Sequence, residues 1–288
     1  MTSCAVDEDA HATLDQALIS PNGTSANGVS PSLISPNGGA SGTPIRLSSV
    51  RATGLRADGT PISIAGTGAP LAGAGLVGTT WTGNVSDGTT IALRIDAAAP
   101  GSDGNAELWS YRVSAAFDGT WRPLCTGASG GPGFADSVGG SWNPDEGVAG
   151  GGAYHAATAE FTLACRGSAI AKCVELGYKP WTGHETQLAA CVRALRGDFC
   201  GDGTPYTADG TLVNLYDEDG VAPDNAAWVP EAEWTANGAR CVSTKKSARF
   251  SQAAHEKASC YPRTLKPSNT CGSEFGENVA IITELPAQ

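Results

Sequence analysis

Nine cysteines set the first limit on the fold of this 288-residue chain, and seven of them lie in its second half. Zinc sites need paired CxxC or HxxxH spacings, so that ligands from short turns converge on one ion, and the sequence contains neither. The remaining interpretation is a framework of disulfide bonds, which persists in an oxidising compartment and therefore implies export. We expect four bridges among eight cysteines, namely Cys125, Cys165, Cys173, Cys191, Cys200, Cys241, Cys260 and Cys271.

Positions along the chain suggest two of these pairings. A Cys125–Cys165 bridge would join two strands, and a Cys260–Cys271 bridge would close a short loop. The other four cysteines allow three connectivities, which the sequence leaves open. In one of them, a Cys191–Cys200 bridge would tie a helix to the segment that follows it.

Cys4 is the ninth cysteine, outside the eight expected to form bridges, and its position indicates a membrane anchor. It follows Thr2 and Ser3, and small residues just before a cysteine resemble the end of a bacterial lipoprotein signal. We expect that an export signal has been removed ahead of this sequence and that Cys4 carries lipid in the native protein. The protein would then lie at the outer membrane or cell surface, or outside the cell. The alternative is a free thiol in a disordered tail.

The charge balance argues against nucleic acid as a partner. Eighteen basic and 29 acidic residues give a net charge of −11 and an isoelectric point near 4.7, so the basic surface of a nucleic-acid binder is missing. No run of about 18 apolar residues occurs, which leaves the lipid anchor as the expected contact with a membrane.

Residues 1–44 are predicted to form a disordered tether. From Ala5 to Pro44 the chain has no Lys or Arg and consists mainly of Ser, Asn, Gly, Pro and Ala. Pro-Asn-Gly, which favours a turn, occurs twice, in Ile19–Gly23 and Ile34–Gly38.

From residue 45 to residue 165 the pattern changes to short alternating segments bounded by turns such as Asp58-Gly59 and Asp87-Gly88. In Thr90–Ala97, isoleucine and leucine alternate with alanine, arginine and aspartate. Period-two alternation with Asp-Gly turns is typical of antiparallel hairpins. We therefore predict a mainly β fold, with an antiparallel sandwich or barrel over residues 45–165.

The part from residue 166 to residue 288 is rich in cysteine and mixes helix with strand. One helix is predicted by four residues at the spacing i, i+3, i+4 and i+7, which are Leu188, Cys191, Val192 and Leu195. Gly197 is placed to end this helix. We expect a disulfide-rich α+β part.

Several short motifs of this part resemble one protein family. They are AKC at Ala171–Cys173, GYKPW at Gly177–Trp181, CGDG at Cys200–Gly203 and DGT at Asp209–Thr211. In this order they are similar to the ADYC-domain family, exported proteins of myxobacteria and their relatives named for an Ala-Asp-Tyr-Cys tetrad. The tetrad here is Gly197-Asp198-Phe199-Cys200, and the likeness runs from Phe161 to Phe250. The resemblance implies export and brings no assigned reaction.

We predict that Asp198 is structural. It follows the glycine expected to end the helix, so its carboxylate can accept backbone N–H groups in the turn that runs into Cys-Gly-Asp-Gly. The alternative is a catalytic role for carboxylates of this segment, Asp198 and Asp202, together with His184.

Asp217-Glu218-Asp219-Gly220 resembles half of a calcium loop, because alternate acidic side chains before a glycine can wrap a hard cation. A full loop has more ligands, which the sequence lacks. Asp217 and Asp219 are therefore either calcium ligands or parts of a tight turn. No cofactor other than calcium is indicated.

Two functions fit these observations. The first is an exported, disulfide-stabilised extracellular module with a structural, adhesion or binding role, whose partner is a surface molecule or a second copy of itself. The second is a secreted hydrolase that uses Asp198, Asp202 and His184. A deep pocket holding two of these groups would favour the enzyme, and a flat surface or exposed sheet edge would favour assembly. We favour the module, because no complete catalytic constellation occurs in the sequence.

Overall fold

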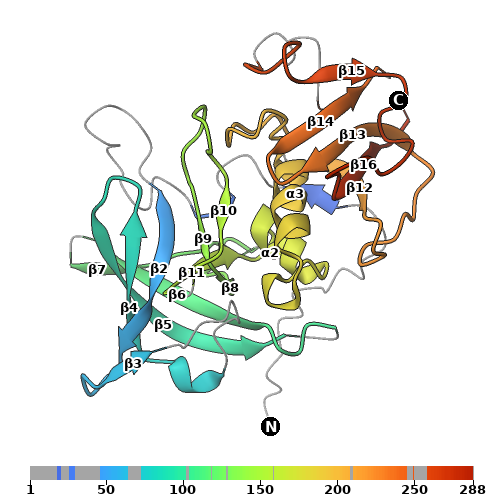
Figure 1. The fold of residues 1–288 in the computed structure, drawn as a ribbon. Coiled ribbons are helices and arrows are strands. Elements are labelled where there is room, and N and C mark those ends of the chain that lie inside the picture. The colour runs from blue at the N-terminus through green and yellow to red at the C-terminus, as the bar shows by residue number, and fades with distance from the viewer. Residues whose placement is uncertain are drawn as a thin grey trace.

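The computed structural model describes residues 18–20, 26–29, 46–63, 73–101, 104–117, 119–127, 129–157, 159–207, 210–244, 249 and 258–287. Strands hold 39% of the described residues and helices 11%, so the fold is mainly β, as predicted. Two sheets lie on either side of a pair of helices (Figure 1).

The first sheet closes into an antiparallel barrel. Its strand order is β11-β8-β6-β5-β4-β2, and a further pairing of β11 with β2 completes the ring. The barrel strands are β2 (Leu47–Leu55), β4 (Thr80–Val85), β5 (Thr90–Pro100), β6 (Trp109–Phe117), β8 (Ala135–Gly139) and β11 (Glu160–Cys165). Two short strands extend it, β3 (Pro61–Ser63) beside β2 and β7 (Thr120–Pro123) beside β6. Of the two architectures expected from the sequence, the structure has the barrel.

Alternation along β5 positions the barrel core. Leu93 and Ile95 are 0% and 2% exposed and belong to the apolar cluster inside the barrel. Arg94 and Asp96 lie on the other face, where they form an ion pair. The alternating pattern of this segment therefore predicted its two faces correctly.

The second sheet has the strand order β1-β12-β16-β13-β14-β15. Its strands are β1 (Leu18–Ser20), β12 (Thr211–Tyr216), β13 (Val229–Thr235), β14 (Gly238–Ser243), β15 (Lys266–Ser268) and β16 (Ile281–Leu285). The pairings are antiparallel except that of β14 with β15. A two-stranded hairpin, β9 (Ser141–Trp142) with β10 (Tyr154–His155), stands beside the barrel.

The helical layer joins the two sheets. Helix α2 (Ala169–Glu175) contacts β8 and β11 of the barrel, and α3 (Glu185–Arg196) contacts β13, β14 and β16 of the second sheet. Two short 3-10 helices are η1 (Ala74–Leu76) and η2 (Pro180–Thr182). Among the described residues, no helix has the length and apolar character needed to cross a membrane.

Helix α3 matches its prediction. All four residues of the predicted apolar face, Leu188, Cys191, Val192 and Leu195, are at most 2% exposed. The helix ends at Gly197, whose φ of 64° lies in the left-handed region that favours glycine.

Four disulfide bonds link the eight expected cysteines, and one of the two proposed pairings is correct. The pairs are Cys125–Cys165, Cys173–Cys191, Cys200–Cys260 and Cys241–Cys271.

The predicted Cys260–Cys271 bridge is wrong. Cys260 lies against the segment that follows α3, where the Cys260 N–H donates to the Cys200 sulfur. The chain after β15 brings Cys271 to β14. The Cys191–Cys200 alternative is also wrong, because Cys191 lies on the buried face of α3 and bonds to Cys173 of α2.

Two described segments of the predicted tether, residues 1–44, take part in the fold. Leu18–Ser20 is paired with β12 as an edge strand, and Val29 is 2% exposed within the barrel core. Asn27 donates from its side chain to the Leu47 carbonyl at 3.0 Å. Partners far away in sequence hold these residues, so local composition does not reveal their structure. The rest of residues 1–44, including Cys4, lies outside the described residues.

Candidate functional site

The tetrad Gly197-Asp198-Phe199-Cys200 forms a corner directly after α3, which we call the tetrad corner. Phe199 is 1% exposed and its ring lies 4.9 Å from that of Trp234, between centroids. Cys200 is bonded to Cys260. The corner is thus anchored by apolar burial and by a covalent bond.

Asp198 is the polar centre of the tetrad corner and is 1% exposed. Its carboxylate forms an ion pair with Arg193 of α3. It also accepts the backbone N–H groups of Asp202 at 3.1 Å and Gly203 at 2.9 Å. These are the turn hydrogen bonds expected for a structural Asp198. Burial raises the pKa of this carboxyl, and the Arg193 charge opposes that rise.

The three residues of the hydrolase alternative do not share a site. Asp198 and Asp202 are neighbours in the tetrad corner, but His184 lies at the other end of the 12-residue helix α3. At a rise of 1.5 Å per residue, that helix separates them by about 18 Å. Hydrogen-bond reach between catalytic groups is about 3 Å, so this arrangement cannot relay a proton directly.

The two aspartates considered as calcium ligands both make hydrogen bonds within the protein. Asp217 accepts the Tyr178 hydroxyl at 2.7 Å and the N–H of Ala222 at 2.6 Å, which closes the turn after β12. Asp219 accepts the side chain of Gln187 at 2.8 Å. Asp217 therefore takes part in the turn that follows β12, and whether calcium binds there stays a prediction.

Another group of metal-ligand types does not hold a metal in this form. The Glu233 carboxylate and the sulfurs of Cys241 and Cys271 lie within 4.8 Å of one another. The two sulfurs are bonded to each other, so no thiolate is present to bind an ion.

The tetrad corner is tied to the loop between β9 and β10. The Arg193 guanidinium, besides pairing with Asp198, donates to the Gly151 carbonyl at 2.6 Å. The N–H of Gly147 donates to the Asp202 carbonyl at 2.9 Å. Arg196 pairs with Glu146 of the same loop at 3.1 Å. The corner therefore sets the position of the β9–β10 hairpin.

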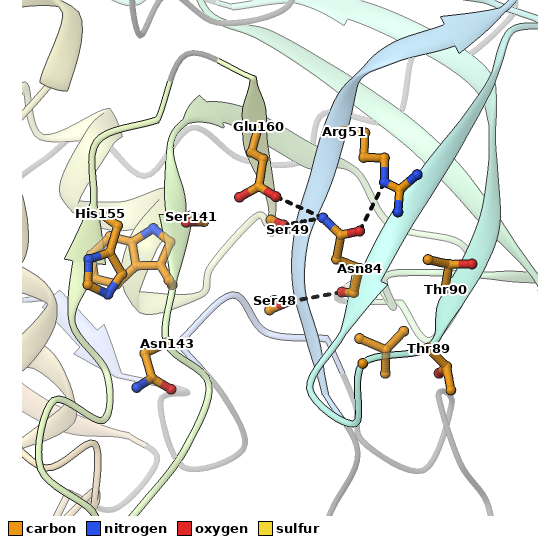
Figure 2. A pocket seen from close by; sticks show the side chains of 13 residues that line it. Ser48, Ser49, Arg51, Asn84, Thr89, Thr90, Ser141, Asn143, His155 and Glu160 are labelled. Carbon is orange, nitrogen blue, oxygen red and sulfur yellow. Dashed lines mark hydrogen bonds between the residues drawn. The ribbon is translucent and has the colours of Figure 1, made fainter.

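This hairpin forms one side of an open groove of about 460 Å³, which we call the polar groove. Its other side is the barrel surface where β2 meets β4 and β11 (Figure 2). The lining residues are Ser48, Ser49, Arg51, Asn84, Val85, Gly88, Thr89, Thr90, Ser141, Trp142, Asn143, His155 and Glu160. Most of them are hydroxyl or amide side chains.

On the barrel side of the groove, the Asn84 amide forms hydrogen bonds with both Arg51 and Glu160. Arg51 and Glu160 are directly opposite each other where β2 pairs with β11. Arg51 Nε donates to Asn84 Oδ1 at 3.2 Å, and Asn84 Nδ2 donates to Glu160 Oε1 at 2.9 Å. Asn84 also donates to Ser49 at 2.9 Å, so all three side chains are held in place (Figure 2).

The lining of the polar groove holds many hydrogen-bonding side chains and few charged ones. Among the described residues that line it, Glu160 is the single carboxylate. Glycoside hydrolysis needs two carboxyl groups about 5 to 10 Å apart. His155 and Asn143 lie across from this carboxylate in Figure 2.

No pattern in the sequence indicates the polar groove. Its residues are spread from Ser48 to Glu160, on six strands and their connections, and none belongs to a recognisable motif. The closure of the barrel between β2 and β11 brings them together, and no local pattern encodes this contact between distant strands.

The family model described as ADYC domain matches residues 73–248. The match starts before β4 and includes most of the barrel, so it is longer than the Phe161–Phe250 likeness found in the sequence. No curated protein and no solved structure matches the chain.

Proposed function

The chain belongs to the ADYC-domain family, and we propose that it is an exported extracellular binding module that takes a small polar ligand into the polar groove. In this proposal Cys4 carries the lipid that attaches it to a membrane surface. The described fold supports the groove from both sides, by the barrel and by the tetrad corner.

The disulfide bonds support an oxidising location. Four bridges within one chain persist where thiols are not kept reduced, which is outside the cytosol. A binding site that must work outside the cell gains from such cross-links, because each typically stabilises the folded state by about 2–4 kcal/mol.

The observation that carries the proposal is the polar groove itself. It is open to solvent, it is lined mostly by hydrogen-bonding side chains, and its described lining includes one carboxylate. Asp198 has a positioning role in this proposal, because its partner Arg193 holds the loop that carries the hairpin side of the groove. No observation favours the hydrolase over the module.

A blocking substitution tests the proposal. The purified, disulfide-bonded chain is titrated by calorimetry with neutral oligosaccharides, acidic oligosaccharides and short peptides. Thr90→Trp places a large ring on an exposed residue that lines the groove. Thr120→Trp is the matched control, because Thr120 is also an exposed strand residue, on β7, and does not line the groove.

We expect one class of these probes to bind with a stoichiometry of one and Thr90→Trp to abolish that binding. Thr120→Trp should bind as the wild type does. Binding that survives Thr90→Trp, or no binding of any probe class to the wild type, would overturn the assignment of the groove.

A further inference from the structure

We propose that the ligand of the polar groove is an uncharged saccharide, held through two neighbouring hydroxyls by Arg51 and Glu160. This inference rests on the proposed function and names the chemical class of the ligand. It follows from the hydrogen-bonding atoms that the groove leaves open to a ligand, and from the small apolar surface and balanced charges of the rest of the lining.

On the barrel side of the groove, Arg51 and Glu160 each have polar atoms open to a ligand. Of the polar side-chain atoms of Arg51 and Glu160, Asn84 contacts Arg51 Nε and one oxygen of Glu160. The terminal guanidinium nitrogens of Arg51 and the second oxygen of Glu160 have no partner among the described residues. The Asn84 amide thus lies between an open donor group on Arg51 and an open acceptor on Glu160.

A pair of neighbouring hydroxyls matches this arrangement. Each hydroxyl can donate one hydrogen bond and accept others, so one can accept from Arg51 while its neighbour donates to Glu160. Hydrogen bonds to charged side chains are stronger than those between neutral groups. The bonds through Asn84 hold both side chains before the ligand arrives, which lowers the entropic cost of binding.

The rest of the lining offers polar groups and little apolar surface. Across the groove lie Ser141, Asn143 and His155, which offer further donors and acceptors (Figure 2). The two large apolar side chains of the lining, Val85 and Trp142, are 6% and 5% exposed, so they offer little apolar surface to a ligand. A peptide would gain little burial of its own apolar side chains here, whereas a polyhydroxyl ring could satisfy most of its polar groups.

Opposite charges are balanced in the described lining of the groove. The described lining has one cation, Arg51, and one carboxylate, Glu160, beside a histidine. Each of these side chains is at least partly exposed to water, and water weakens the attraction between such a side chain and a charged ligand. A strongly anionic or cationic ligand would therefore meet one like charge for each opposite one.

The test compares neutral oligosaccharides with analogues in which one of two adjacent hydroxyls is removed, by calorimetry on the full disulfide-bonded chain. Arg51→Met and Glu160→Gln each remove one of the two charged contacts. The matched controls are Arg56→Met and Glu218→Gln, because both residues are exposed and lie outside the groove.

We expect binding of the neutral oligosaccharide to weaken by about tenfold or more in each groove variant and with each deoxy analogue, and to stay unchanged in both controls. Raising the salt concentration from about 0.1 to 1 M should leave the affinity within about twofold, because screening acts on charged ligands. Unchanged melting temperatures establish that the variants are folded.

The outcomes separate this inference from the proposed function. Peptides or acidic oligosaccharides that bind in the groove while neutral saccharides do not would overturn the saccharide and leave the binding module intact. Neutral saccharides that bind equally well to Arg51→Met and Glu160→Gln would overturn the role of these two residues. No binding of any probe would overturn both.

Discussion

Replacing Asp136 by asparagine should stabilise this protein at neutral and alkaline pH. Asp136 lies on β8, is 0% exposed and accepts the Ser110 hydroxyl at 2.5 Å. Its other oxygen, Oδ2, has no hydrogen-bond donor among the described residues, and the side chain faces the Glu175 carboxylate. Arg166, which pairs with Glu175 at 3.3 Å, is the nearby cation.

The magnitude follows from the pKa of this group. Burial first, and then the Glu175 charge, raise the pKa of Asp136 from 3.8 to about 7. Between these two values the folded state keeps a proton that the unfolded chain releases. The stabilisation that comes from this retained proton is thus complete below pH 3.8, and it is lost as the pH rises to about 7. Three pH units at about 1.4 kcal/mol each correspond to a cost of about 4 kcal/mol above pH 7.

Asparagine avoids this cost because it is neutral at every pH. Its carbonyl can accept from Ser110 and its amide can donate toward Glu175. At about pH 8 we expect Asp136→Asn to unfold with a free energy up to about 4 kcal/mol higher than the wild type. The difference should shrink by about 1.4 kcal/mol per pH unit and vanish near pH 4.

The measurement is urea unfolding followed by tryptophan fluorescence, with the disulfides intact, at several pH values from about 4 to 8. Asp96→Asn is the matched control, since Asp96 also accepts a β6 serine, Ser114, but has Arg94 as a partner. That control should not stabilise the protein. A difference between Asp136→Asn and wild type that is the same at every pH, or a less stable variant at pH 8, would refute the reasoning.

Three further predictions concern the tetrad corner, the cross-links and the anchor. Asp198→Asn should lower the unfolding free energy by about 3–5 kcal/mol in urea, because the buried Arg193 would lose its oppositely charged partner; an unchanged midpoint would contradict this. Replacing both Cys241 and Cys271 by alanine should cost about 3–4 kcal/mol in the same assay, since their bridge spans 30 residues; a loss well under 1 kcal/mol would argue against it. Cys4 should carry a diacylglyceryl group in the native host, and an intact mass without that increment would exclude the anchor.

Local patterns were enough to predict several elements of this fold. The alternation in Thr90–Ala97 predicted the buried and exposed faces of β5, because side chains on a strand point to opposite sides in turn. The helical spacing from Leu188 to Leu195 predicted α3, and Gly197 marked its end, because both depend on residues within one or two turns. The cysteine count and the missing zinc spacings predicted four bridges, because the number of bridges depends on which residues are present and not on which of them meet.

Only the tertiary structure decided which distant residues meet. Cys260 bonds to Cys200, 60 residues away, and not to the nearby Cys271, because the fold places Cys260 against the tetrad corner. The groove likewise depends on Glu160 of β11 lying opposite Arg51 of β2, a pairing set by closure of the barrel. Strand and helix periodicity fix which way a side chain points on its own element, whereas the partner across the fold is selected by the packing of all elements at once.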